Sequence, residues 1–459
     1  MKKVVFLLLI IQFSLIIANA QSGWVESPTG VNRAIRDIYF VNANTGWGVG
    51  DSTIIKSTNS GLNWTRQYFY YLGITASFNT VKFLNENTGY IAGGHSAGFY
   101  DFYYQYIFKT TNGGSNWNLL YNNPGGANSA ISKIFLLNEN NIYLTMAGSY
   151  WNAASGGVYK STNGGLNFSL CISKGESNSI FFIDANTGWV NSYFWTDVPI
   201  DKGYILKTTN GGLNWTEQYK DSLDNATHIY SIQFINQNTG FAIGSKFYNN
   251  KTKFFKTTDG GVNWDTVFYS NGKNKSLFFI NQNTGWIGGF RDFDSSSISY
   301  TTDGGLNWTS QKNNYLNNVI NIFFINNLTG WAALAYSSNI LRTTNGGVTF
   351  ISEINGKLPV SYSLGQNYPN PFNPTTKIKF DIAPFSRSKS LLGGGAGGVL
   401  TSLKVFDITG REIQILVNEK LNPGTYEVTF DGSNYASGVY FYQLRSGDFI
   451  ATKKLILLK

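Results

Sequence analysis

The sequence predicts an all-β protein, with a seven-bladed β-propeller followed by a small antiparallel β-sandwich. Three observations carry this prediction. Aromatic residues make up 16% of the 459 residues and charged residues only 13%, with 50 glycines, a composition that favours short strands and tight turns over helices. A short turn motif recurs seven times, and its copies lie 42 to 53 residues apart. After residue 356 the repeat stops, and a separate set of short strand-like segments begins.

The repeated motif reads Ser/Thr-x-Asn/Asp-x-Gly-x-x-Trp/Phe, as in Thr208 to Trp215. Its hydroxyl group and its Asn or Asp side chain can accept hydrogen bonds from nearby backbone N–H groups and so shape a turn. Its glycine supplies a positive φ, and its final aromatic residue buries a large apolar surface against the hairpin. We therefore expect seven structural anchors, at Trp64, Trp117, Phe168, Trp215, Trp264, Trp308 and Phe350.

A second motif, Asn-Thr-Gly followed by an aromatic residue, keeps step with the first, as in Asn186 to Trp189. Around the two motifs each unit has room for four short strands, which is the composition of a propeller blade. The 3.6-residue periodicity of helical repeats is not visible. Two segments compete to complete the last blade and close the ring, residues 23–26 and residues 348–351.

The repeated turn motif resembles the Asp-box, also called the bacterial neuraminidase repeat. The units around it resemble the propellers of photosystem assembly factors and related exported bacterial proteins. This resemblance covers residues 21–356, and it implies the fold. It says little of activity, because Asp-boxes are structural hairpins in families with very different functions.

Residues 1–20 have the features of a signal peptide. Lys2 and Lys3 precede an apolar run from Val4 to Ile17, and small residues at 18–20 form a cleavage site. The apolar run is too short for a comfortable membrane span, and no other segment could cross a bilayer as a helix. We expect an exported mature chain without a transmembrane segment. Cys171 is the only cysteine, so no intrachain disulfide is expected.

Residues 357–459 form the second predicted domain, a linker and a β-sandwich. It begins with a proline-punctuated extended segment, residues 366–374, and continues with six short strand-like runs. Four ordered motifs, at 368–374, 405–411, 437–442 and 453–455, resemble the type A sorting domain of the type IX secretion system. The resemblance implies recognition by an outer-membrane translocon, followed by surface attachment or release. The motif residues are Pro369, Pro371, Gly410, Arg411, Gly438, Lys453 and Lys454. The glycine-rich insertion 393–398 lacks the Gly-Lys-Ser/Thr ending of a phosphate-binding loop, so we expect an enlarged hairpin loop there.

The sequence shows no convincing catalytic set. Sialidases share an arginine triad and an Arg-Ile-Pro motif, and no Arg-Ile-Pro occurs here. The whole chain has two histidines, which argues against a histidine metal site and against a His-based catalytic triad. We expect neither a metal nor a cofactor. The net charge of +9 is spread without Lys/Arg runs, which argues against nucleic acid as a partner.

Aromatic residues gather in the loops that follow the second strand of each blade and in the connections between blades. Both sets of loops belong to the face opposite the repeated turns, where they form a candidate ligand face suited to stacking on carbohydrate or to binding a peptide. The alternative is that these side chains pack on each other and hold long loops down. The candidate residues are Tyr70, Tyr71, Tyr100, Asp101, Tyr103, Tyr104, Trp151, Trp195, Asp197, Tyr248 and Arg291.

These observations predict a secreted or cell-surface propeller that acts as a binding or structural module, with a glycan or a protein as its ligand. The rival hypothesis is a glycoside hydrolase that uses loop carboxylates on the aromatic face, such as Asp101 and Asp197. The two hypotheses differ in whether two carboxylates converge on a bound sugar.

Overall fold

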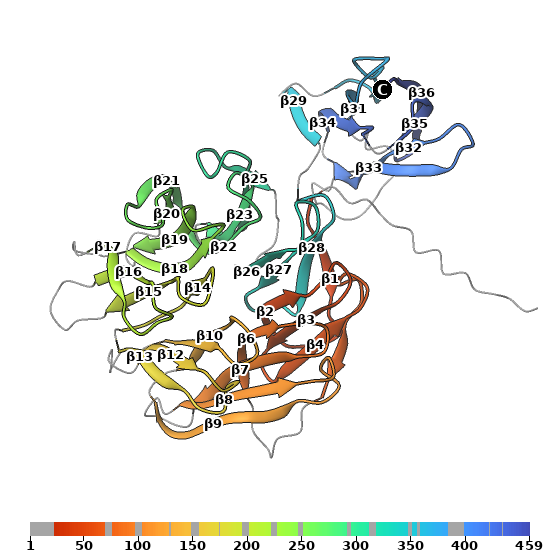
Figure 1. Cartoon of the computed structure of the whole chain (residues 1–459). Coiled ribbons are helices and arrows are strands. Elements are labelled where there is room, and N and C mark those ends of the chain that lie inside the picture. Colours follow the sequence, from red (N-terminus) through yellow and green to blue (C-terminus); the bar gives the residue numbers. More distant parts are fainter. Residues whose placement is uncertain are drawn as a thin grey trace, which may run out of the picture. The chain divides into compact units, whose positions relative to one another are not determined.

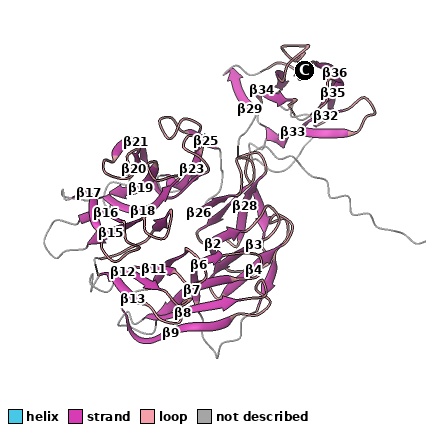
Figure 2. Ribbon diagram, viewed as in Figure 1, coloured by secondary structure: helices cyan, strands magenta, loops and turns pink. Residues whose placement is uncertain are grey.

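The computed structural model describes residues 23–68, 76–96, 103–127, 130–147, 156–173, 175–194, 202–221, 227–246, 251–291, 295–311, 318–347, 351–355, 359–383, 399–421, 423–433 and 435–459. Every regular element in these ranges is a strand, and the strands form nine four-stranded sheets (Figures 1 and 2). The chain divides into two compact units, one spanning Gly23–Thr349 and the other containing Phe350–Lys459. No helix in the described part of the chain is long and apolar enough to cross a membrane.

Seven of the sheets are the blades of a β-propeller, and every strand pair within them is antiparallel. In the first six blades the four strands follow one another in the chain, with the first strand innermost. Blades one to three are β2 (Ile35–Phe40), β3 (Gly46–Gly50), β4 (Thr53–Ser57) and β5 (Thr65–Gln67); β6 (Ser77–Phe83), β7 (Gly89–Ser96), β8 (Tyr103–Thr110) and β9 (Asn118–Ala127); and β10 (Ile131–Leu136), β11 (Ile142–Met146), β12 (Gly157–Ser161) and β13 (Ser169–Ile172).

The next three blades repeat this order, and the seventh borrows a strand. They are β14 (Ile180–Phe182), β15 (Gly188–Phe194), β16 (Lys202–Thr208) and β17 (Thr216–Asp221); β18 (Thr227–Phe234), β19 (Gly240–Lys246), β20 (Lys251–Thr257) and β21 (Asp265–Asn271); β22 (Lys273–Phe279), β23 (Gly285–Arg291), β24 (Ser295–Thr301) and β25 (Thr309–Gln311); and β26 (Val319–Phe324), β27 (Gly330–Leu334) and β28 (Asn339–Thr343) with β1 (Val25–Pro28). The inner strand of each blade contacts that of the next, and β26 contacts β2, so the ring is closed.

The N-terminal segment closes the ring. Strand β1 pairs with β28 as the outermost strand of the seventh blade, which selects residues 23–26 over residues 348–351 as the start of the closing strand. Trp24 is only 7% exposed, and its ring meets that of Phe324 edge-on at 5.6 Å between centroids. The indole N–H donates to Gln311 Oε1 at 2.7 Å. Phe350, the anchor expected for this blade, lies outside the described residues, and Trp24 makes the corresponding contact.

The repeated turns have the hydrogen bonds that their residue types predict. In the fourth blade, Thr208 Oγ1 accepts from the backbone N–H of Gly212 at 2.9 Å, and Asn210 Oδ1 accepts from that of Asn214 at 2.9 Å. The bond from the glycine N–H to the hydroxyl recurs in all seven turns. Gly212 has a φ of +87°, which favours glycine. Each turn is therefore a local device that needs no ligand to hold its shape.

Aromatic stacking between described residues joins neighbouring blades at six of the seven junctions, the exception being the second and third blades. Trp189 of the fourth blade stacks on Phe234 of the fifth at 3.5 Å between centroids, and its indole N–H donates to the carbonyl of Gly260 in the fifth blade's turn at 3.1 Å. The side chain of Lys207 donates to the same carbonyl at 2.9 Å, which explains the lysine before the motif. The glycine of the Asn-Thr-Gly motif is required sterically, because a Cβ on Gly240 would lie 2.5 Å from the Phe234 ring.

The C-terminal unit is the predicted sandwich, with two four-stranded sheets. They are β30 (Ser363–Leu364), β31 (Thr375–Ile382), β34 (Gly424–Asp431) and β29 (Ile351–Asn355); and β33 (Glu412–Leu421), β32 (Val399–Phe406), β35 (Gly438–Ser446) and β36 (Phe449–Leu457). A single buried apolar cluster, including Phe380, Val428 and Tyr442, forms its core. Strand β29 pairs with β34, so this unit begins before residue 357, the start that the sequence predicts for it. The repeat motif runs into β29, which is why the sequence pattern hides this boundary.

Candidate ligand-binding channel

The inner strands of the seven blades surround a central channel. Each inner strand ends in four residues of which the last is apolar. In six of the seven blades a β-bulge interrupts the pairing of the first and second strands just before these four residues. Bulges commonly redirect side chains next to functional sites. Aligning the seven strands on the last residue places equivalent side chains in two tiers.

The first tier is polar. Its members are Asp37, Thr80, Lys133, Ser179, Ser231, Ser276 and Asn321. Several accept a hydrogen bond from the inner strand of the following blade, as Ser179 Oγ does from Ile232 N at 3.1 Å and Ser276 Oγ from Ile322 N at 2.9 Å. The polar tier therefore joins neighbouring blades at the axis.

Asp37 is the centre of the polar tier, and it is fully buried. Its carboxylate accepts from Val81 N at 2.9 Å, from Asn321 Nδ2 at 2.7 Å and from Lys133 Nζ at 3.2 Å, and Lys82 Nζ lies 3.6 Å away. Burial alone would raise the pKa of Asp37, but the charges of Lys133 and Lys82 and the Val81 hydrogen bond outweigh it, so this pKa is lowered. Asp37 is thus held as an anion.

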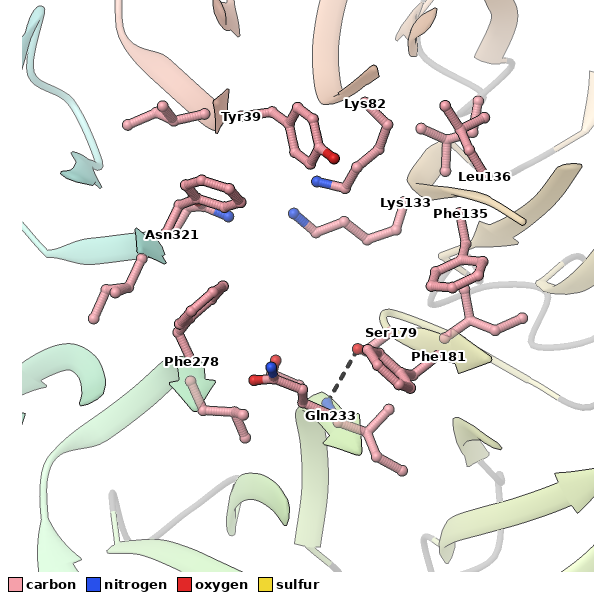
Figure 3. Close-up of a pocket in the computed structure, with 18 of the residues that line it drawn as sticks. Tyr39, Lys82, Lys133, Phe135, Leu136, Ser179, Phe181, Gln233, Phe278 and Asn321 are labelled. Carbon is pink, nitrogen blue, oxygen red and sulfur yellow. Dashed lines mark hydrogen bonds between the residues drawn. The ribbon is translucent and has the colours of Figure 1, made fainter. Parts of the chain in front are cut away.

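The second tier is mostly aromatic, and it forms the wall of a cavity. Its members are Tyr39, Lys82, Phe135, Phe181, Gln233, Phe278 and Phe323. Together with Lys133, Asn321 and other residues of the inner strands, they line a volume of about 320 Å³. Figure 3 shows the amino groups of Lys82 and Lys133 pointing into this space, with the Tyr39 and Phe278 rings around it. The Lys82 ammonium lies 5.0 Å from the centroid of the Tyr39 ring.

The opposite end of the inner strands carries polar and charged side chains at the bulges. Arg36 donates to Asn79 Oδ1 at 3.0 Å and pairs with Asp51 at 2.7 Å. His228 is stacked on Tyr193 at 4.6 Å and lies 3.6 Å from Glu176 Oε1. This end of the blades is also where the aromatic loops predicted as a ligand face begin and end.

The predicted ligand-face residues fall mainly on segments that the structure does not describe. Tyr70, Tyr71, Tyr100, Asp101, Trp151, Trp195, Asp197 and Tyr248 lie outside the described residues. Tyr103 and Arg291 are described only as backbone positions, in β8 and β23. Tyr104 is half-buried, stacks 6.5 Å from Tyr106 and packs on the core between the first two blades. For Tyr104, packing is the described role.

Five of the seven predicted anchors make equivalent contacts in the described residues. The ring of Trp64 meets Phe40 of its own blade edge-on, and those of Trp117, Trp215, Trp264 and Trp308 repeat this contact with the equivalent phenylalanines. Phe168 meets Tyr121 instead, because its blade has Leu136 where the others have phenylalanine. Cys171 is partly exposed, and burial raises the pKa of its thiol. Among the described residues, no group of three His, Cys, Asp or Glu side chains could hold a metal ion.

The four C-terminal motifs contact one another within the sandwich. The Tyr442 hydroxyl accepts from Asn367 N at 2.9 Å and donates to Gly365 O at 2.7 Å, which ties the proline-rich segment to β35. Phe372 is buried, and its N–H donates to Ile456 O of β36 at 3.0 Å. Pro369, Pro371, Gly410, Arg411 and Lys454 are exposed, whereas Gly438 and Lys453 are half-buried. The insertion 393–398 lies outside the described residues.

Comparison with known proteins identifies the C-terminal unit. Residues 366–458 match the model of the secretion system C-terminal sorting domain. The chain carries a sorting domain. The four motifs of the sorting domain are therefore joined by contacts in the structure as well as being ordered in the sequence.

The propeller has counterparts among solved structures. A structure of YCF48 bound to D1 peptide matches with a TM-score of 0.52 and 17% identity, over 70% of this chain and 97% of that chain. An ulvan lyase, a polysaccharide lyase, matches with a TM-score of 0.42 and 12% identity over 71% and 95%. The α-L-arabinofuranosidase from Fusarium graminearum matches with a TM-score of 0.40 and 12% identity over 61% and 96%. No curated protein matches the chain. The likeness to YCF48 shows the propeller fold.

Sequence reasoning missed the channel residues. Asp37, Lys82 and Lys133 are far apart in the chain and belong to strands that look alike, so no local motif marks them. A signal was present in the repeat itself. Aligned on the last apolar residue, the inner strands place a charged residue at positions where most blades have an uncharged polar or aromatic residue.

Proposed function

We propose that this protein is a secreted or cell-surface binding module that the type IX secretion machinery delivers and whose ligand, a glycan or a protein, enters the axial channel. Residues 1–20 serve as the export signal and the sorting domain as the address. The Asp-box turns hold the blades and take no part in recognition, since their polar side chains are used in bonding the turn itself.

The observation that carries this proposal is the composition of the axial cavity. Aromatic rings from several blades, two ammonium groups and amide side chains face one small space. Binding sites for small ligands are mostly apolar and aromatic, with a few placed polar groups.

The rival glycoside hydrolase needs one carboxyl group that can give up a proton and a second that acts as base or nucleophile. Asp37 does not suit the proton-donating step, and no carboxyl group is among the described residues that line the cavity. Its lowered pKa keeps it ionised at neutral pH, and its oxygens already accept from a backbone N–H, an amide and an ammonium group. The rival hypothesis therefore depends on Asp101 and Asp197.

Both hypotheses are tested on the full secreted protein. A glycan array and a peptide array measure binding, and a hydrolysis screen on the same glycans measures turnover. We expect binding without turnover. Turnover that Asp101→Asn or Asp197→Asn abolishes would establish the hydrolase instead, and the absence of binding to every glycan and peptide would contradict the proposal.

The address is tested separately. Deleting residues 360–459 removes the sorting domain, so we expect the propeller to accumulate in the periplasm of a host with a type IX system. Cell fractionation and immunoblotting measure its location. Surface delivery equal to that of the full chain would contradict this part of the proposal.

A further inference from the structure

The charges in the axial cavity are not balanced. Among the described residues that line it, Lys82 and Lys133 are the ionisable amines. Asp37, in the polar tier, is the carboxylate that faces them. The excess is one positive charge. We infer that the cavity binds the carboxylate of a uronic acid residue between these two lysines, with the sugar ring against the aromatic tier. This inference rests on the proposed binding function and names the class of its ligand.

The lysines retain hydrogen-bond donors for such a ligand. Lys133 Nζ donates to Asp37 Oδ1 at 3.2 Å, while Lys82 Nζ lies 3.6 Å from Oδ2, which is an ion pair longer than a normal hydrogen bond. An ammonium group has three N–H donors, so each lysine can bond a second acceptor. Asp37 has its own partners, the Val81 N–H and the Asn321 amide, and these hold it in place when a ligand draws on the lysines.

Burial makes the Lys82 ammonium responsive to a second anion. Burial lowers the pKa of Lys82, the charge of Lys133 lowers it further, and Asp37 only partly offsets these effects. A bound carboxylate would add the negative charge that stabilises both ammonium groups. At the other end of the inner strands, Arg36 pairs with Asp51 and His228 lies beside Glu176. Lys275 lies at that end too, with its Nζ 5.4 Å from the centroid of the Tyr230 ring.

The remaining wall suits a sugar ring. Tyr39, Phe278 and Phe323 form a continuous aromatic group, with centroids 5.3 Å apart for Tyr39 and Phe323 and 5.5 Å for Phe278 and Phe323. Aromatic faces stack on the C–H surfaces of sugars. Asn321 lines the same cavity, and its Nδ2 donates to Asp37 Oδ1 at 2.7 Å.

The size of the cavity also favours one saccharide unit. Its volume of about 320 Å³ is at the small end of the range of roughly 300–1,000 Å³ for ligand sites. That space takes a single ring with one charged substituent. A peptide bound through its C-terminal carboxylate would need room for neighbouring backbone and side chains. Peptide binding is therefore treated as an alternative outcome of the test.

The test is isothermal titration calorimetry of the full secreted protein with glucuronate, with glucose and acetate as probes that lack the charge or the ring. We expect glucuronate to bind more tightly than either probe. Lys82→Met and Lys133→Met should each weaken glucuronate binding about tenfold or more, because charge-assisted hydrogen bonds contribute roughly tenfold to hundredfold in affinity. Asp37→Asn should strengthen it, because the competing negative charge is removed. Lys220→Met, on the exposed outer strand β17, is the matched control.

The outcomes separate this inference from the proposed function. Tryptophan fluorescence of each variant first shows that the propeller is folded. Neutral glycans that bind on the array with no loss in Lys82→Met would leave the binding function in place and overturn the uronate site. Peptides that bind through a free C-terminus when glucuronate does not would overturn it as well. Glucuronate binding that both lysine variants lose, and that Lys220→Met keeps, would establish it.

Discussion

Replacing Trp24 by alanine tests how the propeller ring is closed. The side chain of Trp24 is 7% exposed, packs on Phe324 and donates to Gln311 from the N-terminal segment. A buried aromatic side chain of this kind covers roughly 150–250 Å², and at about 25 cal/mol per Å² that is about 4–6 kcal/mol as an upper limit. Trp→Ala substitutions in cores cost about 3–5 kcal/mol. We expect a loss of about 4 kcal/mol.

The assay is chemical unfolding followed by tryptophan fluorescence. All twelve tryptophans lie between residues 24 and 331, so this signal reports the propeller and not the sorting domain. Trp24→Phe separates packing from hydrogen bonding, since it keeps the ring and removes the bond to Gln311, for an expected loss of about 1–2 kcal/mol. Leu213→Ala, at a side chain that is 76% exposed in a repeated turn, serves as the control.

The order of these three variants decides the matter. The account requires Trp24→Ala to be the most destabilising, Trp24→Phe intermediate and Leu213→Ala close to the parent protein. A Trp24→Ala midpoint equal to that of Leu213→Ala would refute the conclusion that the N-terminal strand closes the ring.

Three further predictions concern local contacts. Gly240→Ala places a Cβ 2.5 Å from the Phe234 ring, so tryptophan fluorescence should show a loss of about 1–3 kcal/mol in unfolding free energy, and a loss below 0.5 kcal/mol would contradict the steric account. Tyr442→Phe removes the hydroxyl that joins Asn367 N to Gly365 O. Amide hydrogen exchange of residues 365–372 should therefore rise about tenfold, while exchange in the propeller stays unchanged. Exchange of residues 365–372 equal to that of the parent protein would count against the role of these hydrogen bonds. The pKa of Asp37 is lowered in the folded state, so the stabilisation from its carboxylate is present above the unfolded pKa near 3.8 and is lost as pH falls through the folded value. The difference in unfolding free energy between the parent and Asp37→Asn, about 2 kcal/mol, should be constant near neutral pH and shrink only below pH 3.8. A difference that shrinks near neutral pH would contradict the lowered pKa.

The fold could be read from the sequence because each blade repeats the same local chemistry. The turn that ends at Trp215 has its hydroxyl, amide and glycine in the places where the backbone needs them, and the structure shows those bonds. The motifs of the sorting domain are similarly local. The sequence leaves ring closure open, since residues 23–26 and 348–351 are both short and strand-like, and the choice depends on which segment reaches β28.

The candidate site was harder to predict, because it is made by seven strands that are distant in the chain. Lys82 and Lys133 lie in different blades, and only the closed ring brings both to Asp37. Most of the aromatic residues predicted as a ligand face lie outside the described residues, so that face stays a prediction. Tyr104 is described, and it packs on the core between the first two blades.

The most direct test of the central claim is a crystal structure of the full secreted protein with the tightest ligand from the arrays. The account predicts ligand density in the axial cavity, with an acidic group within hydrogen-bonding distance of Lys82 and Lys133 and a ring against Tyr39 or Phe278. Density confined to the repeated turns or to the outer strands, with the cavity holding only solvent, would contradict it.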